Sequence, residues 1–145
     1  MRETIEEQLK QQLGIKPASP GHSLLYAELS HAIIGAAIEV HRHIGPGQLE
    51  SVYQRALAHE LALREIPLRA QVPIAMDYKG VNVGEFFADF VVDDSVIVEL
   101  KAVEHLLAVH TAQVLSYLRA TNLKLGLLIN FNVPVVWRGV KRLVR

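Results

Sequence analysis

The stretch FFADFVVDDSVIVELKA, residues 86–102, decides the fold. Its two apolar runs, rich in Val, Ile and Phe, predict two β-strands joined by a tight turn at 93–95. Asp89 lies in the first strand, and Glu99 and Lys101 lie in the second. Because an isolated charge is costly to remove from water, acidic residues in strands this apolar indicate that each has an interaction partner or a functional role.

The register of these two strands depends on the length of the turn. Strand residues two apart point to the same face, so Glu99 and Lys101 lie side by side. A three-residue loop at 93–95 places Asp89 opposite Glu99, whereas a two-residue loop at 93–94 would send Glu99 to the other face. Only the three-residue loop gathers two carboxylates and an ammonium at one point, and we take this register as the working hypothesis.

Length and composition indicate one globular domain. A chain of 145 residues, 50% apolar and 21% charged, is long enough to bury a sizeable core. The chain has no cysteine, which excludes disulfides, thiolate zinc sites and a cysteine nucleophile. The N-terminal sequence lacks the apolar run of a signal peptide, and no stretch approaches the roughly 20 apolar residues that span a bilayer. We therefore expect a cytoplasmic protein without a membrane partner.

The formal net charge is zero. Domains that bind DNA mainly through overall charge usually carry a net positive charge, so a net charge of zero disfavours this class of protein. It leaves open an enzyme that acts on nucleic acid, because an acidic metal site cancels basic residues elsewhere in the sum.

Hydrophobic periodicity divides the chain into an arm and a domain. Residues 1–22 are the predicted N-terminal arm, a helix over 2–13 and then a Pro-rich linker. The arm is either a frayed tail or a segment docked on its own domain or on a second subunit. The domain, 23–145, is expected to contain helices over 24–43, 49–64 and 103–121, and strands over 72–78, 81–92, 96–102, 125–131 and, more briefly, 135–137. This order, α-α-β-β-β-α-β, predicts an α/β fold in which helices flank a mixed β-sheet.

Two carboxylates and a lysine on neighbouring strands suit metal-assisted hydrolysis of a phosphodiester. Mg²⁺ and Mn²⁺ prefer oxygen ligands, which Asp89, Glu99 and the backbone carbonyl of Leu100 supply. Lys101 beside them would orient or deprotonate the attacking water and balance negative charge in the transition state. The alternative is a surface pair between Glu99 and Lys101, with Asp89 part of a turn region. An acid-x-lysine triplet is common, but the apolar context favours the catalytic interpretation.

Other polar residues have plainer interpretations. His41 and His43 are two apart on a helix and point to different faces, so we expect structural roles rather than a metal site with Glu39. Glu50, taken alone, is an acid in the first turn of a helix, where it complements the helix dipole. The C-terminal segment would either bind phosphate or form a solvated tail. Its basic residues are Arg138, Lys141, Arg142 and Arg145.

Three motifs carry a resemblance to a known family. The pattern D-x9-E-x-K, which begins at Asp89, resembles the PD-(D/E)XK nuclease superfamily. Gln113 and Tyr117, in QVLSY, look like the Q-x-x-x-Y motif of its RecB-like exonuclease branch. The segment GQLESVY at 47–53, with Glu50 in the middle, matches the G-x-x-E-x-x-Y signature of a widespread family of small proteins in the same superfamily.

The resemblance covers the chain from about Leu24 to Arg145 and implies a restriction-endonuclease-like domain. One departure is that Ala88 stands where the first motif has proline. By resemblance, Lys101 is the catalytic lysine. The implied metal ligands are Glu50, Asp89, Glu99 and the Leu100 carbonyl. Gln113 and Tyr117 would flank the site, where they contact substrate or orient the lysine.

These observations lead to two expectations about function. The first is a Mg²⁺- or Mn²⁺-dependent nuclease that hydrolyses phosphodiester bonds in nucleic acid, DNA rather than RNA. The second is a non-catalytic nucleic-acid-binding or protein-assembly module that retains the nuclease fold. The neutral charge points to a protein partner or a restricted substrate, and a homodimer is a further candidate assembly.

Overall fold

The computed structural model describes residues 22–145. The predicted helix over 2–13 and the linker after it lie outside these residues. Within them, two helices precede the sheet. Helix α2 runs from His22 to Ile44 and α3 from Glu50 to Leu63. Both helices match the predicted ranges within two residues, and Gly45 and Gly47 between them have the positive φ angles of 74° and 94° that favour glycine.

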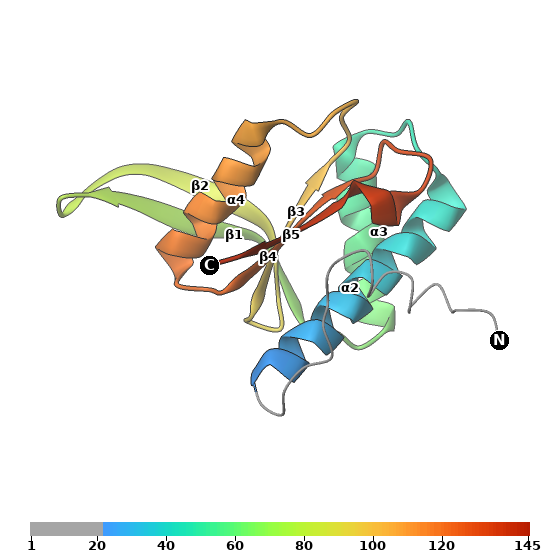
Figure 1. The fold of residues 1–145 in the computed structure, drawn as a ribbon, viewed down its shortest axis with the longest axis horizontal. Helices are drawn as coiled ribbons and strands as arrows, with labels where there is room; N and C mark the ends of the chain where they lie inside the picture. The colour runs from blue at the N-terminus through green and yellow to red at the C-terminus, as the bar shows by residue number, and fades with distance from the viewer. Residues whose placement is uncertain (1–21) are drawn as a thin grey trace.

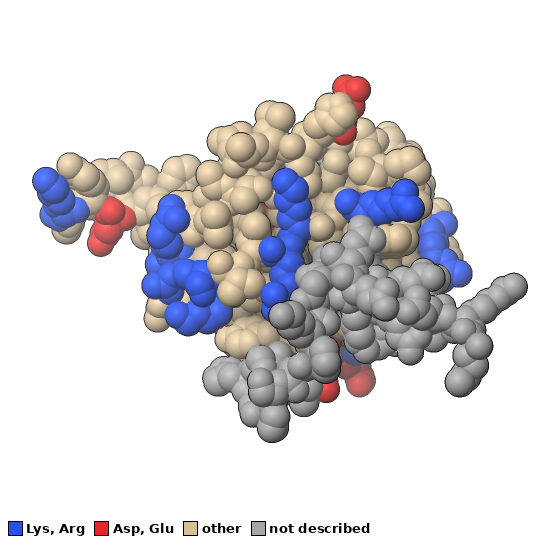
Figure 2. All heavy atoms as spheres, in the orientation of Figure 1, with Lys and Arg blue, Asp and Glu red and all other residues tan. Residues whose placement is uncertain are grey.

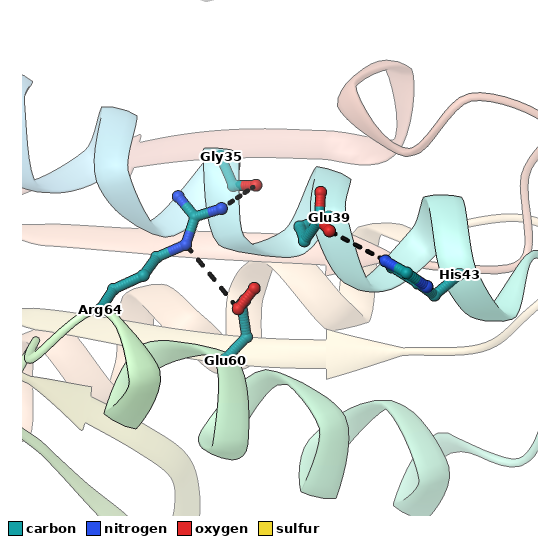
Figure 3. Close-up of polar contacts among 5 residues, drawn as sticks. All are labelled: Gly35, Glu39, His43, Glu60 and Arg64. Carbon is teal, nitrogen blue, oxygen red and sulfur yellow. Dashed lines mark hydrogen bonds and ion pairs between the residues drawn. The ribbon is translucent and has the colours of Figure 1, made fainter.

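Helices α2 and α3 are tied together where α3 ends (Figure 3). The Arg64 guanidinium donates from Nη2 to the carbonyl of Gly35, at 3.4 Å, and its Nε lies 3.9 Å from Glu60 Oε2. A Cβ at position 35 would lie 3.3 Å from the same guanidinium, so glycine leaves room for the contact. Further along α2, Glu39 and His43 form an exposed pair at 2.9 Å.

Five strands form one mixed sheet in the order β1-β2-β3-β4-β5. Strands β3 and β4 are parallel, and every other neighbouring pair is antiparallel. The strands are β1 (Leu68–Tyr78), β2 (Val81–Val92), β3 (Val96–Lys101), β4 (Leu125–Asn130) and β5 (Val140–Val144). Helix α4, Ala108–Thr121, joins the two parallel strands. The predicted α/β fold, a mixed sheet flanked by helices, is therefore confirmed.

The helices cover opposite faces of the sheet (Figure 1). One core cluster joins α2 and α3 to residues such as Val98 and Leu100 of β3. The other joins α4 to Ile97 of the same strand and to Val91 of β2. Because side chains alternate along a strand, Glu99 and Lys101 belong to the α4 side of β3, while Val98 and Leu100 belong to the side of α2 and α3.

The register of the hairpin formed by β2 and β3 is the predicted one. Val92 pairs with Val96 and Phe90 with Val98, which leaves the three-residue loop 93–95. Beyond Phe90 the two strands part. Strand β2 continues outward paired with β1 alone, as the long hairpin of Figure 1, while the last three residues of β3 pair with β4. The sheet therefore forks just where the predicted acidic residues lie.

The predicted start of α4 was wrong. The helix begins at Ala108 rather than at Val103. The backbone of Val103 is held instead by the Asn130 side chain, which accepts from its N–H at 3.1 Å and donates to its carbonyl at 2.8 Å. The Leu107 N–H then donates to His110 Nδ1 at 3.0 Å, which caps the first turn of the helix.

The C-terminal prediction was also wrong. Instead of a strand over 135–137 the chain forms the 3-10 helix η1, Val136–Gly139. The basic segment after it is not a solvated tail, because Val140–Val144 pairs with β4 as an edge strand. The first strand likewise begins at Leu68 rather than at Val72, through pairing with the inner end of β2.

Candidate active site

Asp89 and Glu99 are clamped to each other's strands at the fork between β2 and β3. The Asp89 N–H donates to Glu99 Oε1 at 2.8 Å, and the Leu100 N–H donates to Asp89 Oδ2 at 2.8 Å. Both side chains are buried, 8% and 4% exposed. The two carboxylates thus replace backbone pairing where the strands separate. This reciprocal arrangement requires Asp89 to lie across from Glu99, as the three-residue loop predicts.

Helix α3 brings a third carboxylate to the fork. Its first residue, Glu50, is joined to Asp89 by one amide. Gln54 Nε2, one turn further along α3, lies 3.3 Å from Glu50 Oε1 and 2.9 Å from Asp89 Oδ1 and donates to both. Glu50 is therefore part of the acidic site and not only a helix-dipole residue. Sequence reasoning missed Gln54, although its spacing of four from Glu50 put both residues on one helical face.

Helix α4 approaches the same carboxylates from the other face. Gln113 Nε2 donates to the Tyr117 hydroxyl at 2.9 Å, and Tyr117 is buried. Burial raises the pKa of Tyr117, and the negative charges of Glu99 and Asp89 raise it further. The predicted pair on α4 thus lies within the electrostatic reach of the acidic site.

Gln71 of β1 is a second amide at Asp89 that sequence reasoning missed. It lies between Ala70 and Val72, whose partners Phe90 and Ala88 flank Asp89 on β2. Its backbone has a φ of 52°, a left-handed conformation that is costly for a residue other than glycine. Burial raises the pKa of Asp89, and hydrogen bonding from the Gln71 side chain offsets a part of this rise.

Negative charge outweighs positive charge at the fork. Burial, followed by the neighbouring Asp89 charge, raises the pKa of Glu99 to about 8. Burial also raises the pKa of Asp89 and of Glu50 above their usual values. The positive charge of Lys101 acts in the opposite direction and offsets a part of the rise in all three pKa values. The carboxylates of Glu50, Asp89 and Glu99 outnumber the single ammonium, and this balance of charge favours an additional cation.

The donor types at the fork fit a hard divalent cation. Carboxylate oxygens and the Leu100 carbonyl are the ligands that Mg²⁺ prefers. Among residues 22–145, no three His, Cys, Asp or Glu side chains are grouped closely enough to hold a metal by themselves. Mg²⁺ usually takes only one or two protein carboxylates and completes its shell with water and substrate phosphate, so Asp89 and Glu99 are the residues that would hold it.

The tyrosine of the GQLESVY segment has a structural role. The Tyr53 ring is fully buried and stacks on Phe131, with ring centroids 4.6 Å apart. Its hydroxyl donates to the Gly45 carbonyl at 2.6 Å and accepts from the Gln48 N–H at 3.1 Å. Tyr53 therefore fixes the loop that precedes α3, and Glu50 is the part of this segment that reaches the acidic site.

His41 and His43 of α2 make structural contacts, as expected. His41 Nε2 lies 3.1 Å from the carbonyl oxygen of Phe131, in a buried hydrogen bond. His43 forms its exposed pair with Glu39, away from His41. His105, on the segment before α4, is also exposed.

The basic residues of the C-terminal segment do not form one group. Lys141 pairs with Leu128 and Arg142 with Leu127, so the two side chains lie on opposite faces of the sheet. Leu128 also pairs with Glu99, which puts Lys141 on the face of the acidic site, two strands away. Arg138 lies in η1 against Trp137, 5.3 Å from the ring centroid. Of Arg138, Lys141 and Arg142, Lys141 is the one that shares a sheet face with Glu99.

Comparison with known proteins gives one result. Residues 27–143, most of the chain, match the family described as the PD-(D/E)XK nuclease superfamily. Searches of curated proteins and of solved structures found no match. The mixed sheet with helices on both faces is consistent with a restriction-endonuclease-like fold. No helix in the described part of the chain is both long and apolar enough to cross a membrane.

Proposed function

Because the chain belongs to the PD-(D/E)XK nuclease superfamily, we propose that it is a metal-dependent nuclease that hydrolyses phosphodiester bonds in nucleic acid, DNA rather than RNA. Members of this superfamily are generally nucleases that use divalent metals such as Mg²⁺. The observation that carries the proposal is the clamp at the fork, in which Asp89 and Glu99 each accept a backbone N–H from the other's strand. It fixes two buried carboxylates beside Lys101.

Each proposed role follows from a position at the fork. Asp89 and Glu99, with Glu50 and the Leu100 carbonyl, would hold Mg²⁺ or Mn²⁺. When bound, such an ion supplies an activated water and polarises the scissile phosphate. Lys101 lies two residues from Glu99 on the same face of β3, where it would orient or deprotonate the attacking water. Its ammonium also offsets negative charge in the transition state.

The surrounding residues support a finer assignment, to the G-x-x-E-x-x-Y family and the RecB-like branch. The first assignment is supported by Gln54, whose amide joins Glu50 of the G-x-x-E-x-x-Y segment to Asp89. The bond between Gln113 and Tyr117 joins the two ends of the Q-x-x-x-Y motif beside the carboxylates. In the proposal Gln113 and Tyr117 position substrate or Lys101, and Lys141 contacts phosphate at the edge of the same face.

One observation favours a second candidate, a non-catalytic nucleic-acid-binding or protein-assembly module. The net charge is zero, and on the side of the molecule drawn in Figure 2 the Lys and Arg residues lie in separate groups rather than as one basic surface. Such a surface offers little general attraction for a duplex. The raised pKa values at the fork favour the enzyme, because perturbed carboxylates concentrate at functional sites.

A cleavage assay with Mn²⁺ tests the proposal. The substrates are single-stranded, duplex, nicked and branched DNA, and RNA. The parent should cleave at least one DNA, and Lys101→Ala should lose at least about a hundredfold in rate. The matched control is Lys124→Ala, because Lys124 is an exposed lysine just before β4, at the opposite end of the sheet.

Cleavage by Lys101→Ala at the parent rate would overturn the proposed role of this lysine. If the parent cleaves none of these substrates while it binds one of them, the non-catalytic module becomes the better account.

A further inference from the structure

The outer part of the β1–β2 hairpin exposes two neighbouring aromatic rings. Phe86 is 44% exposed and Phe87 is 52% exposed. Successive residues of a strand point to opposite faces, so the two rings lie on opposite faces of the hairpin. They form a natural pair for comparison, because they have the same chemistry and nearly the same exposure.

The Phe86 ring lies on the side of α4, next to the acidic site. Its centroid is 6.3 Å from that of the Tyr117 ring, at an interplanar angle of 41°. Tyr117 in turn feels the charges of Glu99 and Asp89. A Cβ at position 84 would come within 3.2 Å of the Phe86 ring, so Gly84 leaves room for the ring in this position. The exposed surface of Phe86 is thus one ring away from the candidate catalytic residues.

The charges around the fork argue against a substrate that is bound mainly through its phosphates. Duplex binding depends on Lys and Arg contacts to the backbone. At the fork, Lys101 faces three carboxylates, and the basic groups visible in Figure 2 are dispersed. Stacking on an aromatic ring needs no such basic surface, but it needs an unpaired base, because bases within a duplex are already stacked on each other.

We propose that the Phe86 ring stacks on an unpaired base beside the scissile phosphate, and that the substrate is single-stranded nucleic acid. This inference rests on the proposed nuclease function and names the substrate class for it. The base would lie against the outer surface of Phe86, while Tyr117 supports the other side of the ring. Phe87, on the opposite face of the hairpin, takes no part in this contact.

Binding to the full chain carrying Lys101→Ala tests the inference without cleavage. The probe is a fluorescein-labelled oligothymidylate of about 12 nucleotides, a length that fits one single-strand site, and binding is followed by fluorescence anisotropy. Adding Phe86→Ala should weaken binding roughly tenfold, and Phe86→Trp should restore it. Phe87→Ala should leave the affinity unchanged. A duplex of the same length should bind more weakly and should not distinguish Phe86→Ala from its parent.

A second arm identifies the stacked base. A single abasic position is moved along the oligonucleotide, and one position should weaken binding to the Phe86-containing protein as much as Phe86→Ala does. In the Phe86→Ala protein the same abasic position should have no further effect. Circular dichroism checks that both alanine variants are folded.

Two results would overturn the inference. Equal affinities of the Phe86→Ala and Phe87→Ala proteins would contradict the stacking contact. Tighter binding of the duplex would contradict the proposal that the substrate is single-stranded. If the protein with Lys101 intact still cleaves DNA with Mn²⁺, either result leaves the nuclease function standing. Failure to bind or cleave any of the nucleic acids would overturn both proposals.

Discussion

The inner and outer halves of β2 have almost the same kinds of residues and very different surroundings. The inner half, Ala88–Val92, is buried throughout, whereas most of Val81–Phe87 is exposed. The inner half runs between β1 and β3, but the outer half pairs with no strand other than β1. The change occurs at Asp89, where the sheet forks. A strand that loses one neighbour leaves backbone groups unpaired, and here carboxylates bond to two of them.

This comparison suggests why the acidic site lies at the fork. Buried carboxylates are costly unless their oxygens accept hydrogen bonds. At the fork, the N–H groups of Asp89 and Leu100 supply those bonds, and the amide of Gln54 adds another. Further out, an acid such as Glu85 is exposed to solvent and needs no such partners.

The largest expected difference between the two halves is in stability. Phe90 is 2% exposed in the inner half, and Phe87 is 52% exposed in the outer half. Phe90→Ala should lower the free energy of unfolding by about 3–5 kcal/mol, because it leaves a cavity in the core. Phe87→Ala should change it by no more than about 0.5 kcal/mol. Urea unfolding measures both values. Similar losses in the two variants would contradict the division of β2 into a core half and a projecting half.

A more gradual effect on stability is expected from pH in metal-free buffer. The pKa of Glu99 is raised from 4.5 to about 8, chiefly by burial. Between these values the folded protein keeps a proton on Glu99 that the unfolded chain has lost. The free energy of unfolding should therefore fall as pH rises through this range, by up to about 1.4 kcal/mol per pH unit.

The Glu99 contribution is isolated by substitution. Glu99→Gln should reduce this slope, measured by urea unfolding from about pH 5 to about pH 8. Glu85→Gln, on the exposed outer half of β2, serves as the control and should keep the parent slope. A slope that Glu99→Gln leaves unchanged would show that Glu99 titrates near its usual pKa.

The sequence predicted the parts of the site that depend on local pattern. Strand alternation sets Lys101 beside Glu99. The three-residue loop, preferred over a two-residue loop because it gathers the charges, sets Asp89 opposite Glu99, and the observed pairing of Val92 with Val96 confirms it. The helices that bring Glu50 and Tyr117 to the fork follow from strong apolar periodicity in α3 and α4. These features are local, because each depends on residues close together in the chain.

The parts that sequence reasoning missed depend on contacts between distant segments. The start of α4 is decided by Asn130, 27 residues beyond Val103, together with the His110 cap. Strand β5 was hidden by its basic residues, and only its pairing with β4 makes it a strand. Gln54 shared a helical face with Glu50, and Gln71 lay in an edge strand, but polar residues at such positions are common whether or not they contact a carboxylate.

The most direct test of a metal site at the fork is Mn²⁺ uptake, measured by titration calorimetry. The parent should bind Mn²⁺, and Asp89→Asn should abolish the binding. Asp94→Asn is the matched control, because Asp94 lies in the exposed turn between β2 and β3, where it pairs with Arg69 at 3.1 Å. That variant should bind Mn²⁺ as the parent does. No uptake by the parent, or equal uptake by the Asp89→Asn protein, would contradict the proposal that the fork between β2 and β3 is a metal-dependent active site.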